Sequence, residues 1–248
     1  MARRRFYVPK QLICGQSAAL PPEQAHHLRD VLRLSAGDEV EIFDGEGAEY
    51  AGAIESCGRE VRVGQLQRVD PPRTAVRQVA LATALIKLER FEWLLEKATE
   101  LGVSEFIPLV TRYCSIRIPG PRAEARMGRW RRIATEASRQ CGRSDVPVIR
   151  HPVAFDEFLR SRRPAAQARY LLFEGSERVL GPDCAAPGGA LLCVGPEGGW
   201  DPGEVKAAVA EGFAAFSLGP QILRSETAAI AAAALFLIGT AGMDAGAK

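Results

Sequence analysis

Hydrophobic and polar positions alternate along residues 3–70 in the way expected of β-strands. Glycine-containing turns separate the alternating runs, which is typical of antiparallel strands. The runs are DEVEIFDG (38–45), AEYAGAIESC (48–57) and REVRVGQLQRV (59–69). A helix is also predicted over residues 23–34, because Leu28, Val31 and Leu32 fall on one helical face. The pattern therefore predicts a small β domain.

Beyond residue 72 the pattern changes to alternating strands and helices. The stretch VDPPRTAVRQ (69–78) breaks all periodicity, because its two prolines fix φ and remove backbone donors. Strands are predicted over 78–86, 105–110, 146–150, 169–173, 190–194 and 213–217, and helices over 88–102, 123–140, 154–161, 202–211 and 226–238. We therefore expect a β domain over 1–72 and an α/β domain with a largely parallel sheet over 73–248.

Charge is distributed unevenly along a chain of otherwise ordinary globular composition. Residues 1–173 carry 28 Lys+Arg against 21 Asp+Glu, whereas residues 174–248 carry 4 against 9. A basic front portion favours a nucleic-acid partner, although an arginine-rich, lysine-poor chain also fits a GC-rich genome. No run of about 18 apolar residues is present, and MARRRFYVPK lacks the apolar segment of a signal peptide. A cytoplasmic location is expected.

The cysteines and histidines give no sign of a metal site. The six cysteines form no C-x-x-C pair, and the three histidines form no ligand pattern with them. We therefore expect reduced thiols and no metal.

A glycine-rich loop follows the predicted strand 190–194. In ALLCVGPEGGWDPGEVKAAV (190–209) the chain continues into a helix with Asp201 as N-cap, Pro202 at the first helical position and Glu204 completing a capping box. The glycines allow the backbone to approach a ligand closely, while a tight turn with positive φ is the simpler explanation. No P-loop is present, and no G-x-G-x-x-G follows the first strand of the α/β domain, so common nucleotide motifs do not explain the loop.

A second unusual stretch, LGPQILRSETAAIAAAALFLIG (218–239), crowds polar residues in front of an apolar helix. The carboxyl ends of parallel strands hold ligands, so this stretch is expected to meet the glycine-rich loop and the loop after 169–173. A purely structural explanation is also open. Ser225 would then be a plain N-cap, and Glu226 would complement the helix dipole.

GPEGGW followed by LGPQILRSETA resembles the RsmE-type methyltransferases of the SPOUT superfamily, which methylate N3 of a uridine in 16S ribosomal RNA. Further stretches fit the same family in the expected order: HHLRDVLRLSAGDEVEIFDG (26–45), KATELGVSEFIPLVT (97–111) and EASRQCGRSDVPVI (136–149). The resemblance covers the whole chain. It implies a PUA-like or OB-like β-barrel for RNA, a SPOUT domain with a deep trefoil knot, a homodimer and S-adenosylmethionine as cofactor. General folding rules alone would predict an unknotted sheet.

The resemblance also implies a cofactor pocket and an RNA-binding face. The implied cofactor residues are Leu172, Phe173, Gly195, Pro196, Glu197, Gly198, Leu218, Gly219, Ile222, Leu223 and Thr227. The candidate RNA-binding residues are Arg3, Arg4, Arg5, His27, Arg29, Arg33 and Arg112. At TRYCSI (111–116) the chain departs from the family pattern, so either Arg112 has moved into the role of the family's arginine by one position or Tyr113 stacks on RNA.

Methyl transfer from a sulfonium is an in-line displacement, and uracil N3 carries a proton that some group must accept. Arg224 is the candidate for stabilising the uracil anion or positioning phosphate, and Glu226 for accepting the proton or orienting Arg224. Two other functions remain open. One is methylation of another ribosomal or transfer RNA nucleotide, and the other is RNA binding without catalysis. The two intact motifs argue against the latter, because a binding module needs neither.

Overall fold

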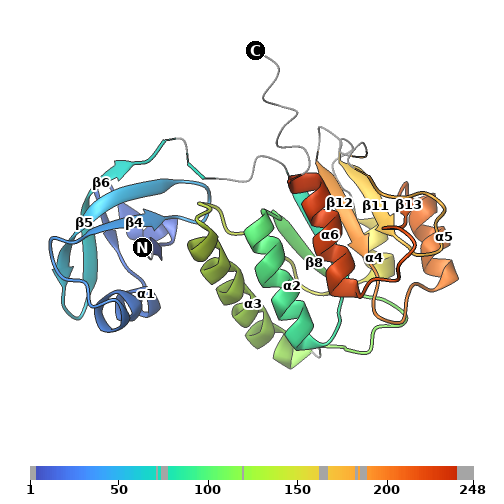
Figure 1. Ribbon diagram of the computed structural model, residues 1–248. Coiled ribbons are helices and arrows are strands. Elements are labelled where there is room, and N and C mark those ends of the chain that lie inside the picture. The colour runs from blue at the N-terminus through green and yellow to red at the C-terminus, as the bar shows by residue number, and fades with distance from the viewer. Residues whose placement is uncertain are drawn as a thin grey trace, which may run out of the picture. The chain divides into compact units, whose positions relative to one another are not determined.

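The computed structural model describes residues 4–70, 72–73, 78–118, 120–161, 167–181, 184 and 189–238 (Figure 1). The chain divides into two compact units. The first comprises Met1–Ala75 together with Thr135–Val146, and the second comprises Val76–Ala134 together with Pro147–Lys248. The sequence predicts a boundary near residue 72, and it gives no indication that a segment from the middle of the chain joins the first unit.

The first unit is built on a six-stranded sheet with the order β1-β4-β5-β6-β3-β2. Its strands are β1 (Arg5–Tyr7), β2 (Ile13–Cys14), β3 (Ser17–Ala19), β4 (Glu39–Phe43), β5 (Glu49–Cys57) and β6 (Val61–Arg68). The pairs β4–β5 and β5–β6 are antiparallel, and β1 pairs with β4 in parallel. The three predicted strands are confirmed. The other three have only two or three residues, too few for a period of two to be recognised.

The helical segment of the first unit differs from the prediction. It consists of α1 (Pro22–His26) followed by a π-helical turn (His27–Val31), in which the Leu32 backbone N–H donates to the carbonyl of His27 at 2.9 Å. The wider turn changes the direction of the later side chains. Leu28 is fully buried, whereas Val31 is 57% exposed. The prediction that Val31 belongs to the buried face is therefore wrong.

A buried arginine, Arg5, makes hydrogen bonds to both chain segments of the first unit. Arg5 is fully buried, and its Nε lies 3.2 Å from Oε1 of Glu49. Its Nη1 donates to the carbonyls of Ser138 (3.2 Å) and Arg143 (2.8 Å). Ser144 accepts from Nη2 of Arg5 at 3.3 Å and donates to Glu49 at 2.7 Å. The guanidinium is thus satisfied inside the protein, as a buried charge must be.

The second unit contains a parallel sheet with the order β10-β8-β7-β12-β11-β13, and β9 pairs with β8. Its strands are β7 (Val79–Ala84), β8 (Glu105–Val110), β9 (Val148–Ile149), β10 (Val153–Ala154), β11 (Ala168–Leu172), β12 (Ala190–Val194) and β13 (Ala214–Phe216). All their pairings are parallel, which confirms the predicted parallel sheet. The central strands β7 and β12 are buried throughout, because helices cover both faces.

Two helical layers cover this sheet (Figure 1). The helices are α2 (Leu88–Leu101), α3 (Gly120–Cys141), α4 (Phe155–Arg160), α5 (Pro202–Ala210) and α6 (Ser225–Leu237). On one face Leu171 and Leu191 share a core with Phe158 of α4 and Ala208 of α5. Alternate strand residues point to the opposite face, which α2 and α6 cover. Helix α3 begins in the second unit, and its last turns belong to the first.

Local signals explain where the helices of the second unit begin and end. Gly102 adopts φ 107°, a left-handed conformation that suits glycine and ends α2 as predicted. Trp130 of α3 is fully buried against Phe91 of α2, with ring centroids 4.6 Å apart. Among the residues that the structure describes, no helix is long and apolar enough to cross a membrane, and no three His, Cys, Asp or Glu side chains are grouped to hold a metal ion.

Candidate active site

The loops that follow β11, β12 and β13 surround one cavity of about 270 Å³. It lies at the carboxyl ends of these strands, where ligands of parallel sheets bind. Most of the predicted cofactor residues line it: Leu172, Phe173, Gly195, Pro196, Glu197, Leu218, Gly219, Ile222 and Leu223. Gly198 and Thr227 are not among the lining residues. The expectation that three distant loops come together is therefore met by the geometry.

Trp200 connects two of these loops and was not anticipated from the sequence. Its indole Nε1 donates to the carbonyl of Leu172 at 2.8 Å, and its ring lies 4.9 Å from that of Phe155. A Cβ added to Gly195 would lie only 2.9 Å from the indole ring. Gly195 is therefore required for the approach of Trp200 to the backbone. The tryptophan directly after the glycines in GPEGGW was the available signal.

The other two glycines of the loop have separate reasons. Gly199 has φ 75°, and its N–H donates to the carbonyl of Pro196 at 3.0 Å. Gly199 therefore forms a tight turn with positive φ, which is the simpler of the two reasons for a glycine in this loop. A Cβ on Gly198 would lie 3.0 Å from Cβ of Tyr113, so the loop at 111–118 packs directly against the glycine-rich loop. The glycines thus serve close packing and a turn at the edge of the cavity.

Helix α5 begins with the predicted capping box. The Asp201 side chain accepts from the backbone of Gly203, and Glu204 accepts from the backbone of Asp201. The same carboxylates hold the loop whose RNA role the sequence left open. The Arg112 N–H donates to Glu204 at 2.9 Å, and the Tyr113 hydroxyl donates to Asp201 at 3.2 Å. The Arg112 side chain is 69% exposed and the Tyr113 residue 46% exposed, so both are accessible beside the site.

Helix α6 begins at Ser225, and the predicted N-cap role of Ser225 is wrong. Arg224 occupies the N-cap position, and no side chain caps the helix. The Ser225 hydroxyl instead donates to the carbonyl of Gly195 at 2.5 Å. Because Ser225 is already helical, its hydroxyl is free to bind the neighbouring loop. Arg224 and Ser225 both line the cavity.

Glu226 lies on another side of α6 from the cavity-lining Ser225 and Ala228, as the 100° rotation per helical residue requires. Its side chain is 10% exposed, and Oε1 lies 3.8 Å from Nε of Arg90. Nη1 of Arg90 in turn donates to Glu197 at 3.2 Å. The two predicted catalytic residues therefore lie in different places: Arg224 lines the cavity, whereas Glu226 lies beside Arg90.

Trp200 provides a direct test of how the loops are joined. We expect Trp200→Phe to keep the ring contact with Phe155 but to leave the Leu172 carbonyl without its donor, which costs about 1–3 kcal/mol of stability. The displaced loop should weaken S-adenosylmethionine binding roughly tenfold, as measured by calorimetry. Trp93→Phe, at a residue 47% exposed, is the matched control. Equal affinities in the two variants would contradict a connecting role for Trp200.

The candidate RNA-binding residues of the first unit have different environments. Arg3 lies outside the described residues. The prediction for Arg5 is wrong, because its guanidinium is fully buried and cannot reach RNA. Arg4 pairs with Asp38 at 2.9 Å, and Arg29 donates to Asp30 at 2.8 Å. The remaining candidate arginine, Arg33, is exposed.

His27 is half-buried, and its ring centroid lies 6.3 Å from that of Phe6 at an interplanar angle of 62°. Burial and the nearby charge of Arg139 lower the pKa of His27 below the usual histidine value. The ring is therefore neutral at pH 7 and can offer RNA a hydrogen bond rather than a charge.

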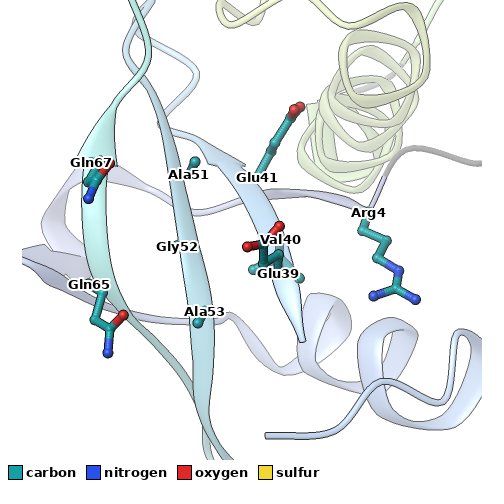
Figure 2. Close-up of a pocket in the computed structure, with 9 residues that line it drawn as sticks. All are labelled: Arg4, Glu39, Val40, Glu41, Ala51, Gly52, Ala53, Gln65 and Gln67. Carbon is teal, nitrogen blue, oxygen red and sulfur yellow. The ribbon is translucent and has the colours of Figure 1, made fainter. Parts of the chain in front are cut away.

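A hollow of about 450 Å³ lies on the sheet of the first unit (Figure 2). Its lining residues are Arg4, Glu39, Val40, Glu41, Ala51, Gly52, Ala53, Gln65 and Gln67. The two carboxylates beside Arg4 disfavour a phosphate there. Residues 1–72 carry nine Lys+Arg against eleven Asp+Glu, so the basic surplus of the front portion lies in residues 73–173. Charge alone therefore gives no reason to place phosphate contacts mainly in the first unit.

Comparisons with known proteins agree with these two parts of the chain. The RNA methyltransferase domain family matches residues 72–237, and the RNA methyltransferase PUA domain family matches residues 20–60. Ribosomal RNA small subunit methyltransferase E from Mycobacterium bovis is 32% identical over 255 residues, covering 100% of this chain and 96% of that protein. The chain belongs to this methyltransferase family.

Solved structures of similar proteins support the same assignment. A methyltransferase from Legionella pneumophila, in complex with the cofactor S-adenosylmethionine, is 32% identical with a TM-score of 0.85, covering 95% of this chain and 97% of that one. The ribosomal RNA small subunit methyltransferase E from Neisseria gonorrhoeae, bound to S-adenosylmethionine, is 30% identical with a TM-score of 0.85, covering 94% and 95%. The methyltransferase fold is thus a mixed α/β fold with a PUA domain.

The cavity of this methyltransferase fits S-adenosylmethionine by its chemistry. Leu218, Ile222 and Leu223 supply apolar side chains for a flat ring. At Gly219 the nearest atom to an added Cβ would be Oε1 of Gln221 at 3.9 Å, so the backbone there can approach a ligand closely. A concave, mostly apolar site with a few fixed polar groups is the usual form of a cofactor pocket.

Proposed function

We propose that this protein transfers the methyl group of S-adenosylmethionine to N3 of a uridine in 16S ribosomal RNA. One observation carries the proposal: the glycine-rich loop and the segment LGPQILRSETA meet at a single cavity, with Arg224 in its wall. When bound, the cofactor supplies a methyl group on a positively charged sulfur. The protein must then hold the uracil in line with that methyl group and remove the proton from N3.

Arg224 and Glu226 are proposed to divide this work. Arg224 is exposed and lines the cavity, and its guanidinium is proposed to stabilise the negative charge that uracil acquires when N3 loses its proton. Glu226 is proposed to accept the proton or to orient Arg224. The predicted cofactor residues Gly198 and Thr227, which do not line the cavity, are proposed to support its loops.

The RNA is proposed to bind both units. Arg112 and Tyr113 are exposed beside the glycine-rich loop, and they suit the nucleotides that flank the target. The proposed RNA-binding residues of the first domain are Arg3, Arg4, His27, Arg29 and Arg33. A mixed charge pattern there suits contacts to bases more than to phosphates.

The remaining architecture is also proposed rather than observed. We propose boundaries at 1–72 and 73–248, an OB-like barrel in the first domain and a deep trefoil knot in the second. The protein is proposed to act in the cytoplasm as a homodimer.

Two measurements test the function. Ribosomal RNA from a strain lacking this protein should lose one 3-methyluridine on mass spectrometry of its nucleosides, and the wild-type chain should restore it. Calorimetry should give saturable binding of S-adenosylmethionine. Loss of a different methylated nucleotide would contradict the uracil-N3 assignment. An absence of saturable binding would favour a protein that binds RNA without catalysis.

A further inference from the structure

Tyr113, in the loop that follows β8, is held at both ends of its side chain. Its hydroxyl donates to Oδ2 of Asp201, just before α5, at 3.2 Å. At the other end its Cβ would lie only 3.0 Å from a Cβ added to Gly198, so the glycine lets the tyrosine pack closely against the backbone. Tyr113 is nevertheless 46% exposed. The orientation of its ring is therefore fixed, while a large part of the residue faces solvent.

Two carboxylates at the start of α5 fix the loop that carries Tyr113. Oε2 of Glu204 accepts from the backbone N–H of Asp201 in the capping box, and its Oε1 accepts from the backbone N–H of Arg112 at 2.9 Å. Asp201 divides its oxygens in the same way, with Oδ1 accepting from Gly203 and Oδ2 from Tyr113. Each carboxylate thus binds the helix with one oxygen and the loop with the other.

The side chain of Arg112 is held less firmly than that of Tyr113. It is 69% exposed, and its Nε lies 3.4 Å from Oδ2 of Asp201. An ion pair with this exposure fixes a side chain only weakly, and the carboxylate reduces the attraction of the guanidinium for a phosphate. The sequence leaves open which of the two residues contacts RNA. The geometry favours Tyr113, because a ring that is already fixed loses less entropy on binding.

The Tyr113 loop lies at the same edge of the sheet as the cofactor cavity. Strands β8 and β12 belong to one parallel sheet, so the loops that follow them emerge at a common edge. The packing of Tyr113 against Gly198 brings these two loops into contact. The glycine-rich loop also lines the cavity through Gly195 and Glu197. A nucleotide bound at Tyr113 would therefore neighbour one whose base reaches the cavity.

We propose that a base beside the target uridine stacks on Tyr113, and that Asp201 and Glu204 are positioning residues that hold Tyr113 for this contact. Bases of single-stranded RNA stack on aromatic side chains, and every base has a face that can do so. The stacked base fixes the RNA strand beside the cavity, so that the target base is aligned with the methyl group. This proposal rests on the proposed function, because it names a contact that places the RNA of that reaction.

The test measures how full-length variants bind ribosomal RNA from the strain lacking this protein, without cofactor and at several salt concentrations. Tyr113→Ala is expected to raise the dissociation constant of the RNA by about 5- to 100-fold, the usual loss of one stacked base. The salt dependence should equal that of the wild type, since the ring carries no charge. Tyr113→Phe keeps the ring and should weaken binding less than Tyr113→Ala. Arg112→Ala should also weaken it less.

Glu204→Gln separates the capping box from the loop contact. Glutamine still accepts from the Asp201 N–H, but it has a single side-chain oxygen, so the Arg112 N–H loses its acceptor. RNA binding should weaken by about three- to tenfold. The dissociation constant of S-adenosylmethionine should stay within about threefold, because Glu204 is not among the residues that line the cavity. Glu211→Gln makes the same charge change at the other end of α5 and is the control.

A double variant separates positioning from a general structural role. If Glu204 acts through Tyr113, Glu204→Gln combined with Tyr113→Ala should bind RNA no more weakly than Tyr113→Ala alone. Additive losses, wild-type affinity in Tyr113→Ala, or a smaller salt dependence in that variant would overturn the proposal. If Tyr113→Ala fails to fold, Tyr113→Leu, which also lacks the ring, gives the same comparison. Failure of the proposed function is distinct, because it concerns the formation of 3-methyluridine, whereas RNA affinity is measured without methyl transfer.

Discussion

Arg224→Ala is expected to lower the rate of methyl transfer by about 10²- to 10³-fold, the usual loss when one group that stabilises developing negative charge is removed. Arg224 lies in the cavity wall and contributes its carbonyl to α6, where it accepts from the Ala228 N–H at 2.8 Å. Alanine keeps this backbone bond, so the start of the helix should persist. The effect should therefore be confined to the guanidinium.

Single-turnover rates and calorimetry together check this prediction. The affinity for S-adenosylmethionine should be nearly unchanged, since the proposed role of Arg224 concerns the uracil. Arg150→Ala is the control, because Arg150 is exposed and pairs with Glu105. Normal turnover would remove Arg224 from the mechanism. A parallel loss of cofactor affinity would reassign it to the cofactor pocket.

Glu49→Ala is expected to destabilise the first unit by about 3–5 kcal/mol, because it removes the buried counter-charge of Arg5 and leaves only the partly exposed Glu41, whose Oε2 lies 3.9 Å from Nε. The side chains of Arg5 and Glu49 are both fully buried. Ser144 would also lose the acceptor of its hydroxyl. Glu46→Ala removes an exposed pair with Lys10, which water and salt screen, and should cost far less stability. Amide hydrogen exchange of β4 and β5 reports the first unit directly, and equal protection in the two variants would contradict the prediction.

Acid should reproduce part of this effect. Burial acts to raise the pKa of Glu49, but the hydrogen bond from Ser144 and the charges of Arg5 and Arg73 outweigh it and lower the pKa below the usual glutamate value. The folded pKa is therefore below the unfolded value of about 4.3, so the stabilisation is complete above that pH and is lost as pH falls through the folded pKa. Protection of β4 and β5 should decline over this acidic range, and less so in Glu49→Ala.

The sequence predicted elements whose side chains alternate over several residues, because burial on one face leaves a clear period. Strands β4, β5 and β6 and helix α2 are of this kind. The π-helical turn at His27–Val31 was missed, because one backbone hydrogen bond shifts its register without changing the composition. The helical pattern over 123–140 was found, but it runs without interruption through the division between the units. Periodicity carries no information about such a division.

The site was predicted in part, for similar reasons. Motifs located the three loops, since each is continuous in sequence. Pairings between distant residues were not predictable: Arg5 and Glu49 are 44 positions apart, and Arg90 and Glu197 are 107 apart. A buried arginine and an RNA-binding arginine look alike in composition, so Arg5 was assigned to the surface. Its partners alone distinguish the two.

The split of the first unit between Met1–Ala75 and Thr135–Val146 also has a consequence for synthesis on the ribosome. Domains usually fold in order as the chain emerges, at about 5–20 residues per second. Arg5 and Glu49 cannot form their hydrogen bonds with Ser144 until that residue has been synthesised. At those rates its synthesis follows that of Ala75 by roughly 4–14 s. During that interval the nascent sheet carries an ion pair that lacks its closing segment, so β1 and β5 are expected to settle only once the chain has passed Val146.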